Sequence, residues 1–159
     1  LMYMFITTPE PGNPRYDPSQ LAMSMRSKLK VVPPEIAALR EQITDDSAVV
    51  YRPLEWLFLE APWYKGRVVL IGDAAHATTP HLGQGAGMAI EDSIVLAEEI
   101  TRGQSVESAF AAFQERRYDR CRYIVESSVA ICRSQLGTGP KVEQAAATKA
   151  MFERVAQPI

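Results

Sequence analysis

The chain has 159 residues, of which 47% are hydrophobic, and it carries a formal net charge of −2 with a sequence pI of about 5.7. This length suits one ordinary domain, and the composition supports a hydrophobic core and excludes a disordered chain. The acidic balance argues against a general nucleic-acid-binding protein, which normally shows a basic patch or stripe, and no apolar run is long enough to span a membrane.

The first 60 residues predict a mixture of strands and helices without recognisable chemistry. Aromatic and branched residues over 1–8 indicate a strand, and the prolines over 9–18 indicate a loop. A second strand is predicted over 48–59, where aromatic residues alternate with leucines. Because the chain starts with leucine inside a strand-like pattern, we expect the natural protein to contain residues before it.

Two short helices are predicted between these strands. Ser19 is expected to cap a helix that reaches about Lys30, because a serine side chain can accept a hydrogen bond from a free backbone N–H. Pro34 suits the first turn of a second helix, which we expect to extend to Ile43.

From residue 68 onward the pattern predicts a buried strand followed by helices. Residues 68–71 are all apolar, as in a strand of a parallel sheet that is buried on both faces. Apolar residues then recur at helical spacing over 85–101, and again in a long helix over 105–136 that Ser105 is expected to cap. A last short helix is predicted over 142–155.

The two cysteines, Cys121 and Cys132, both fall within the long predicted helix. The helix between them spans roughly 16 Å, which is too far for a disulfide. We therefore expect reduced, buried thiols and a cytoplasmic protein.

A strand, an aspartate, a glycine-rich turn and a helix follow one another between residues 68 and 93. In an open α/β sheet, Gly72 and Asp73 would lie at the carboxyl end of the strand, where ligands bind. The following helix start offers unpaired N–H groups to an anion, and Asp73 offers a carboxylate to sugar hydroxyls. These features indicate a nucleotide-like cofactor. The alternative is purely structural, with glycines that allow close packing and an aspartate that bonds turn amides.

The stretch "GRVVLIGDAAHATTPHLGQGAGMAIEDS" resembles the second flavin motif of the FAD-dependent aromatic-ring hydroxylases. These are single-component flavoprotein monooxygenases of the para-hydroxybenzoate and salicylate hydroxylase type. The resemblance extends from Trp63 to Leu96 and is looser on both sides. It implies an α/β fold in which this chain is the C-terminal part of a two-domain FAD/NAD(P)-binding monooxygenase, with a mixed sheet followed by long helices.

The resemblance also implies roles for individual residues. The Asp73 carboxylate would bond the ribityl chain of FAD, and Pro80, the one catalytic candidate, would lie beside the isoalloxazine ring. The backbone at the helix entry would approach the pyrimidine edge, where N–H donors stabilise the negative charge of reduced flavin. His76 would be structural rather than catalytic. The expected cofactor-binding residues are Gly72, Asp73, Pro80, Leu82, Gly83, Gln84, Gly85, Ala86, Gly87 and Met88.

The implied reaction uses NAD(P)H to reduce FAD. O₂ then adds to give a flavin C4a-hydroperoxide, which hydroxylates an aromatic or similar small organic substrate. The ADP-binding and NAD(P)H-linked motifs of the family's N-terminal half do not occur here. We therefore expect activity only together with that missing half, and an isolated chain that is inactive. The alternative is a non-catalytic remnant or interaction module that has lost the cofactor.

The resemblance divides the chain into three parts. Residues 1–60 would be the end of the substrate-binding sheet domain, 61–103 the C-terminal part of the FAD-binding domain, and 104–159 helices that pack on that domain. A relative that oxidises a non-aromatic substrate remains a further alternative within the same enzyme class.

His76 and His81 raise the question of a metal site. Their spacing does not place them on one helix face, and the sequence shows no cysteine or acidic partner that would complete a ligand set. We therefore expect no metal.

Other polar and aromatic groups have two possible interpretations each. Glu91 and Asp92 are expected to complement a helix dipole rather than to serve as acid and base. Tyr51, Trp56 and Phe58 are expected in the core rather than in a substrate cavity. Four arginines of the long predicted helix are expected on its solvated face rather than in an anion-binding patch: Arg116, Arg117, Arg120 and Arg122.

Overall fold

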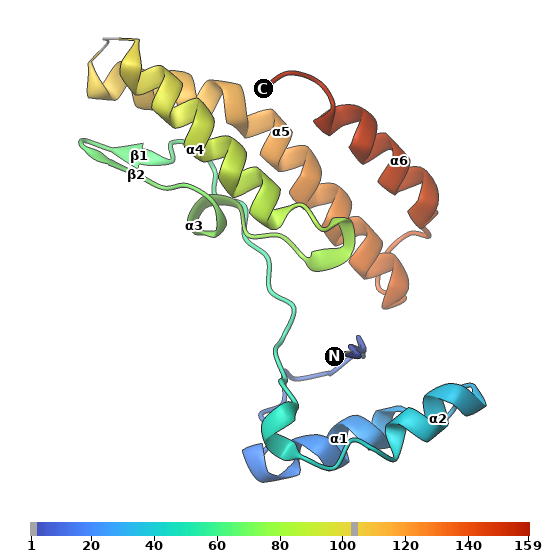
Figure 1. Cartoon of the computed structure of the whole chain (residues 1–159). Helices are drawn as coiled ribbons and strands as arrows, with labels where there is room; N and C mark the ends of the chain where they lie inside the picture. Colours follow the sequence, from blue (N-terminus) through green and yellow to red (C-terminus); the bar gives the residue numbers. More distant parts are fainter. Residues whose placement is uncertain (1–2, 103–104) are drawn as a thin grey trace. The chain divides into compact units, whose positions relative to one another are not determined.

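The structure is a computed structural model that describes residues 3–102 and 105–159. The chain separates into two compact units, Leu1–Pro53 and Leu54–Ile159. The first unit combines short helices with long irregular segments, whereas helices dominate the second unit, whose described part contains one small sheet (Figure 1). This mixture of helices and strands confirms the predicted α/β class. The predicted boundary between residues 103 and 104 lies outside the described residues.

The first unit contains short helices, which carboxylate side chains cap and connect through hydrogen bonds to backbone N–H groups. Its elements are the 3-10 helices η1 (Pro18–Gln20) and η2 (Asp46–Ala48) and the helices α1 (Leu21–Lys28) and α2 (Pro34–Arg40). The carboxylate of Asp17, rather than the Ser19 hydroxyl, caps this region and accepts the Ser19 N–H at 2.9 Å. Asp46 accepts the Ala22 N–H at 2.7 Å and so connects η2 to α1. Both predicted helices are therefore confirmed, with somewhat shorter bounds.

The two strands predicted in the first 60 residues are wrong. Residues 3–8 and 49–59 contain no strand, and residues 1 and 2 lie outside the described residues. A strand needs a neighbouring backbone with which to exchange hydrogen bonds. In the described part of the chain, the segment 49–59 donates two such bonds to another segment, from the N–H groups of Leu57 and Leu59 to the carbonyls of Ala77 and Ala75, each at 2.9 Å. These two bonds at its end do not make the segment a strand. The alternation of side chains therefore indicates an extended backbone, but it does not show whether a neighbouring strand pairs with it.

The second unit begins with an antiparallel hairpin of β1 (Tyr64–Lys65) and β2 (Val68–Val69). The connection is only two residues long, which suits an antiparallel pair and not a parallel one. Val68 is 65% exposed. The prediction of a parallel strand buried on both faces is thus wrong, because a short apolar run does not specify the direction of its partner.

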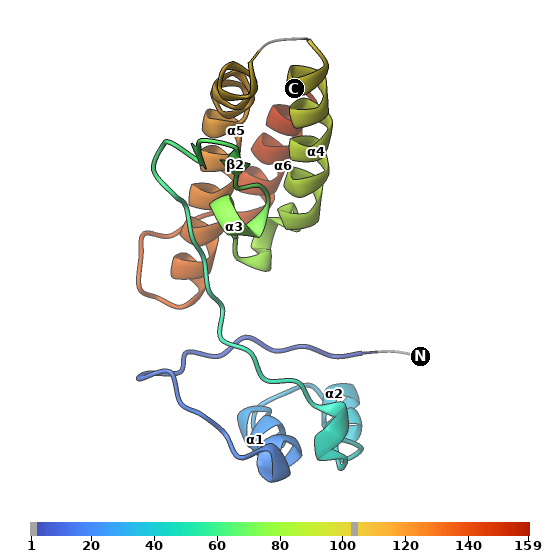
Figure 2. The ribbon, with the colours of Figure 1, turned by 90° about the vertical axis from the view of Figure 1, so that its left-hand side faces the viewer.

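Helices form the rest of the second unit: α3 (Asp73–His76), α4 (Gly85–Thr101), α5 (Val106–Gln135) and α6 (Gln144–Val155), with the 3-10 helix η3 (Pro80–Leu82) before α4. The spacing-based predictions of α4, α5 and α6 are confirmed to within two residues. Ser105 caps α5 as expected, and its Oγ accepts the Ser108 N–H at 3.2 Å. α4 and α5 lie side by side in both views, and α6 packs on α5 (Figure 1 and Figure 2).

The core of the second unit joins the hairpin, α3, α4 and α5. Trp63 is buried at its centre, and its indole Nε1–H donates to the Leu59 carbonyl at 2.9 Å. Met88 from α4 and Phe113 from α5 pack in the same cluster. A second cluster joins η3, α5 and α6. Among the described residues, no helix combines the length and apolar character needed to cross a bilayer.

Candidate cofactor-binding site

The site begins at the turn between β2 and α3, which only glycine suits. Gly72 has φ 57° and ψ −141°, a backbone conformation that side-chain-bearing residues rarely adopt. A Cβ built on Gly72 would lie 3.2 Å from the Cβ of Ala89 in α4. This close approach fits the structural interpretation of the glycine. It places the strand end against α4 only four residues, about 6 Å along the axis, from the start of that helix.

Asp73 does not bond the amides of the turn, as a purely structural aspartate would. It is the first residue of α3 and is exposed, and no side chain caps that helix. Within the described residues, its carboxylate has no hydrogen bond or ion pair, so it does not bond turn amides. An exposed carboxylate held by a rigid turn is free to accept hydrogen bonds from a ligand.

The helix entry after η3 leaves its backbone donors free of a side-chain cap. Pro80 starts η3 and is exposed, and Gly83 ends it with φ 64°. Gln84 occupies the N-cap position of α4 but makes no capping hydrogen bond. The first N–H groups of α4, with the positive end of the helix dipole, therefore remain available to a polar ligand. The predicted residues of the first turn are Gly85, Ala86 and Gly87, all partly or fully exposed.

Two predicted site residues have buried side chains. Leu82 packs in the cluster with Ile131 and Met151, and Met88 is 1% exposed in the main core. These side chains anchor the segment, so only their backbone is left to face a ligand.

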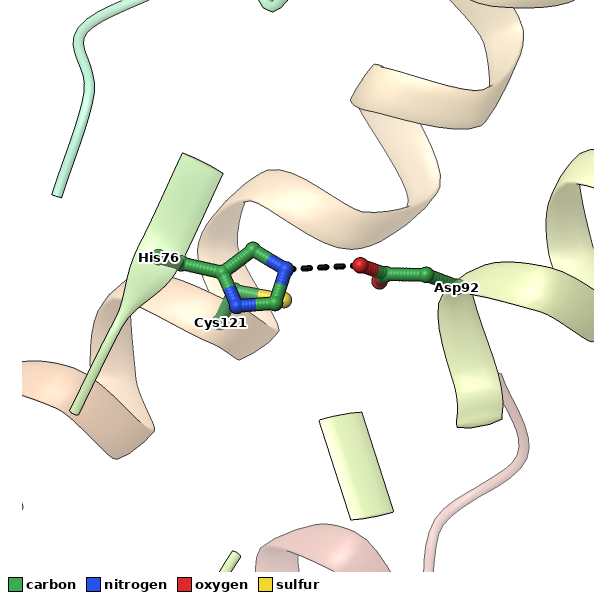
Figure 3. Close-up of side chains that lie close together, drawn as sticks. All are labelled: His76, Asp92 and Cys121. Atoms are coloured by element: carbon green, nitrogen blue, oxygen red, sulfur yellow. Dashed lines mark hydrogen bonds and ion pairs between the residues drawn. The ribbon is translucent and has the colours of Figure 1, made fainter. Parts of the chain in front are cut away.

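Asp92 is the centre of a buried hydrogen-bond network that ties this region together. Its Oδ2 accepts the Gly72 N–H at 2.8 Å and lies 2.7 Å from Nε2 of His76 (Figure 3). Its Oδ1 accepts Nε–H of Arg117 at 2.8 Å. The expectation that Asp92 complements a helix dipole is wrong, because it lies two turns into α4 and faces α5 and α3 in the core.

The charges of this network hold one another in their ionised forms. Burial acts to lower the pKa of His76, but the bond to Asp92 and the neighbouring Cys121 sulfur raise it to about 9. Burial likewise acts to raise the pKa of Asp92, but His76, the Gly72 amide and Arg117 bring it below its ordinary value. Near neutral pH, His76 is therefore an imidazolium paired with a carboxylate.

Arg117 and Arg120 extend the network from α4 to α6. Arg117 is fully buried, and its Nη1 lies 2.6 Å from Oε2 of Glu91. Arg120 forms a two-pronged pair with Glu91 at 2.9 and 2.6 Å. It also donates to backbone carbonyls at the end of α6, that of Val155 at 2.7 Å among them. The arginine cluster thus joins three helices.

The expected solvated face is therefore wrong for these two arginines, and Arg116 is only partly exposed. Arg122 does lie on the exposed side of α5. The sequence did contain a hint, because Arg117 falls on the same helical stripe as the buried residues Phe113 and Ile124. Its position on this stripe determines its burial more than its charge does.

Three side chains come together that could hold a metal. Potential ligand atoms of His76, Asp92 and Cys121 lie within 4.8 Å of one another, although the sequence showed no acidic or cysteine partner for the histidine (Figure 3). The guanidinium of Arg117 contacts both Asp92 and, at 3.5 Å, the Cys121 sulfur. A permanent positive charge at these atoms opposes the binding of a cation, so the absence of a metal stays a prediction.

The segment between α3 and η3 is held on α5 by a pair of buried hydroxyls. Ser128 Oγ donates to the Thr79 carbonyl at 2.6 Å, and the two hydroxyl oxygens lie 2.9 Å apart. Nothing in the sequence links Thr79 to Ser128, which are 49 residues apart. The sequence hinted only at the burial of Ser128, because this polar residue lies on the apolar stripe of the long helix.

The three aromatic residues Tyr51, Trp56 and Phe58 belong to two different units and have different surroundings. Phe58 packs edge-on against Trp63 and belongs to the core side of the unit. Trp56 is about half exposed, with the Arg133 guanidinium 5.8 Å from its ring. Tyr51 packs against Tyr16 within the first unit. The structure confirms the core expectation for Phe58.

A family model described as an FAD binding domain matches residues 38–128, which is more than half of the chain. The chain belongs to this FAD-binding family. The match includes the hairpin, the Gly72 turn, α3, η3 and α4, together with most of α5. It confirms the resemblance to the FAD-dependent aromatic hydroxylases.

Individual relatives agree with this family. YetM of Bacillus subtilis is 45% identical over 96 residues, which are 60% of this chain and 26% of YetM. The FAD-dependent monooxygenase SAT7 of Stachybotrys chartarum is 39% identical over 105 residues, 60% of this chain and 21% of SAT7. The structure of a variant of HpxO from Klebsiella pneumoniae complexed with FAD superposes with a TM-score of 0.74 and 25% identity, over 94% of this chain and 38% of HpxO. The chain thus spans about a quarter of the length of YetM and about a fifth of that of SAT7.

Proposed function

We propose that the complete protein containing these residues is an FAD-dependent monooxygenase, and that residues 72–88 form part of its flavin site. The observation that carries the proposal is the exposed Asp73 carboxylate, which has no hydrogen-bond or ion-pair partner among the described residues and lies in the same segment as the uncapped start of α4. FAD offers hydroxyls on its ribityl chain and polar atoms on its pyrimidine edge, so this set of acceptors and donors fits it.

Each group has a separate task in this proposal. Asp73 accepts hydrogen bonds from ribityl hydroxyls and so orients the cofactor. The first N–H groups of α4 donate to the pyrimidine edge, where fixed donors and the helix dipole stabilise negative charge. Pro80 is exposed between these two groups in sequence, and we assign it to the face of the isoalloxazine ring.

The bound cofactor supplies the transfer of electrons from NAD(P)H to O₂ that ring hydroxylation requires. We propose an aromatic or similar small organic substrate, because the resemblance from Trp63 to Leu96 is to aromatic-ring hydroxylases. The remaining FAD contacts are assigned to residues outside this chain, which spans 38% of HpxO. Both cysteines are free and buried, which suits a reducing compartment such as the cytoplasm.

The test is an oxygenation assay on the complete protein. NAD(P)H oxidation and O₂ uptake are followed with a panel of phenols, benzoates and quinolones, and products are identified by mass spectrometry. The proposal expects substrate-stimulated O₂ uptake and a product that has gained one oxygen atom. A protein that binds FAD but never oxygenates a substrate would contradict the monooxygenase assignment. A protein that takes up no FAD would contradict the flavin site itself.

A further inference from the structure

Resting on the proposed flavin site, we propose that His76 and Asp92 act as a positioning pair, which fixes α3 against α4 and so sets where Asp73 meets FAD. Neither residue is assigned a direct contact with the cofactor. Their effect on binding is instead transmitted through the backbone of the turn at Gly72.

A single carboxylate oxygen holds the turn in place. Oδ2 of Asp92 accepts the Gly72 N–H at 2.8 Å and lies 2.7 Å from Nε2 of His76. Gly72 is the residue before α3 and His76 is its last residue. Both ends of this four-residue helix are therefore tied to one atom of α4, and Asp73 is the first residue between the two ties.

The same network reaches the other half of the proposed site. Arg117 holds Oδ1 of Asp92 at 2.8 Å, and its Nη2 lies 3.3 Å from the Met88 carbonyl at the entry of α4. One guanidinium thus fixes the positions of both the turn that carries Asp73 and the helix start that carries the N–H donors. A ligand that contacts both groups requires this fixed separation.

Water is excluded from the pair. His76 is 1% exposed and Asp92 is fully buried, and the Trp63 ring lies 5.4 Å from the imidazole. Among the described residues, the titratable groups that face His76 are Asp92 on α4 and Cys121 on α5. Arg117 on α5 contacts both of them, Glu91 on α4 joins this group through Arg117, and Asp73 lies three residues before His76 on α3.

The pair contributes to stability, but stability alone does not require this geometry. Buried ion pairs add little net stability compared with well-packed apolar side chains, and their best-attested use is to specify one geometry. The unpartnered Nδ1 of His76 shows that the imidazole is fixed through Nε2 alone within the described residues. The pair is therefore suited to define the position of the turn.

The experiment measures FAD affinity by flavin fluorescence in the complete protein, for wild type, His76→Gln, Asp92→Asn and the double variant. Positioning partners of metal ligands typically contribute 10- to 100-fold to affinity, so we expect each single variant to bind FAD about tenfold more weakly. The double variant should be little worse than either single one, because both changes release the same turn. Asp119→Asn is the matched control, since it makes the same chemical change at an exposed site on α5.

The pH profile separates positioning from general stability. A charge-assisted hydrogen bond is about twice as strong as a neutral one, so wild-type FAD affinity should fall about fivefold between about pH 8 and pH 10. His76→Gln should lack this fall. In wild type, which needs no substitution, the Gly72 amide resonance should titrate together with the His76 imidazole.

Each outcome has a distinct meaning. Wild-type FAD binding with unchanged affinity in both single variants, or a Gly72 amide that does not follow His76, overturns the positioning pair alone. A variant that does not fold leaves the wild-type pH profile and the Gly72 titration to decide. A wild-type protein that binds no FAD overturns the proposed function and the pair with it.

Discussion

The charge on His76 makes the stability of the second unit depend on pH. The pKa of His76 is about 9 in the folded protein, compared with an ordinary value of 6.5 in the unfolded chain. The folded state therefore binds the proton more tightly. This contribution to stability is complete below about pH 6.5 and is lost as the pH rises through about 9.

The magnitude follows from the difference between the two pKa values, which corresponds to about 3 kcal/mol in the free energy of unfolding. Solvent screening takes little from it, because His76 is 1% exposed and its partner Asp92 is fully buried. Such a change is a large part of the total stability of a domain, which is typically about 5–15 kcal/mol.

The assay is urea unfolding at a series of pH values, followed by tryptophan fluorescence. Both tryptophans, Trp56 and Trp63, lie in the second unit and report on it. Wild type should lose stability between about pH 6.5 and pH 9, and His76→Gln should remove that slope. His81→Gln is the matched control, because the pKa of His81 is lowered by burial and its effect lies at lower pH with the opposite sign. Parallel curves for wild type and His76→Gln would refute a charged, buried His76.

Three further predictions concern single side chains. Asp73→Ala should weaken FAD binding about 10- to 100-fold with an unchanged circular dichroism spectrum, and equal affinity in a fluorescence titration would remove this residue from the site. Gly72→Ala should destabilise the protein to urea by about 1–3 kcal/mol, because its backbone conformation is strained for alanine and the new Cβ meets α4 at 3.2 Å, whereas Gly87→Ala meets only a flexible side chain. Arg117→Met should cost about 3–5 kcal/mol in urea unfolding, because it removes the buried guanidinium that Asp92 and Glu91 share, while Arg122→Met at an exposed pair should change little; similar values for both would contradict the network.

The sequence predicted well what depends on local periodicity. The helix over Gly85–Thr101 was predicted with its observed bounds, and Ser105 caps the long helix as expected. Helical spacing and a capping side chain are properties of a few consecutive residues, so they can be recognised without the rest of the fold. The flavin motif was recognised for the same reason, since it is one continuous stretch.

What depends on partners distant in sequence could not be predicted. The apolar run at Val68 gave no sign of an antiparallel neighbour at Lys65, and the residues before it lack the sheet that their alternation suggested. Arg117 was expected on a solvated helix face and Asp92 as a complement to a helix dipole, but the two side chains neutralise each other across two helices. Polarity alone does not reveal a buried pair when its members lie 25 residues apart.

The most direct test of the flavin site is the visible absorption spectrum of the purified complete protein, normalised to protein concentration. We expect flavin bands at a stoichiometric FAD content, or full uptake of FAD that is added afterwards. A colourless protein that also fails to take up added FAD would contradict the claim that residues 72–88 form part of a flavin site.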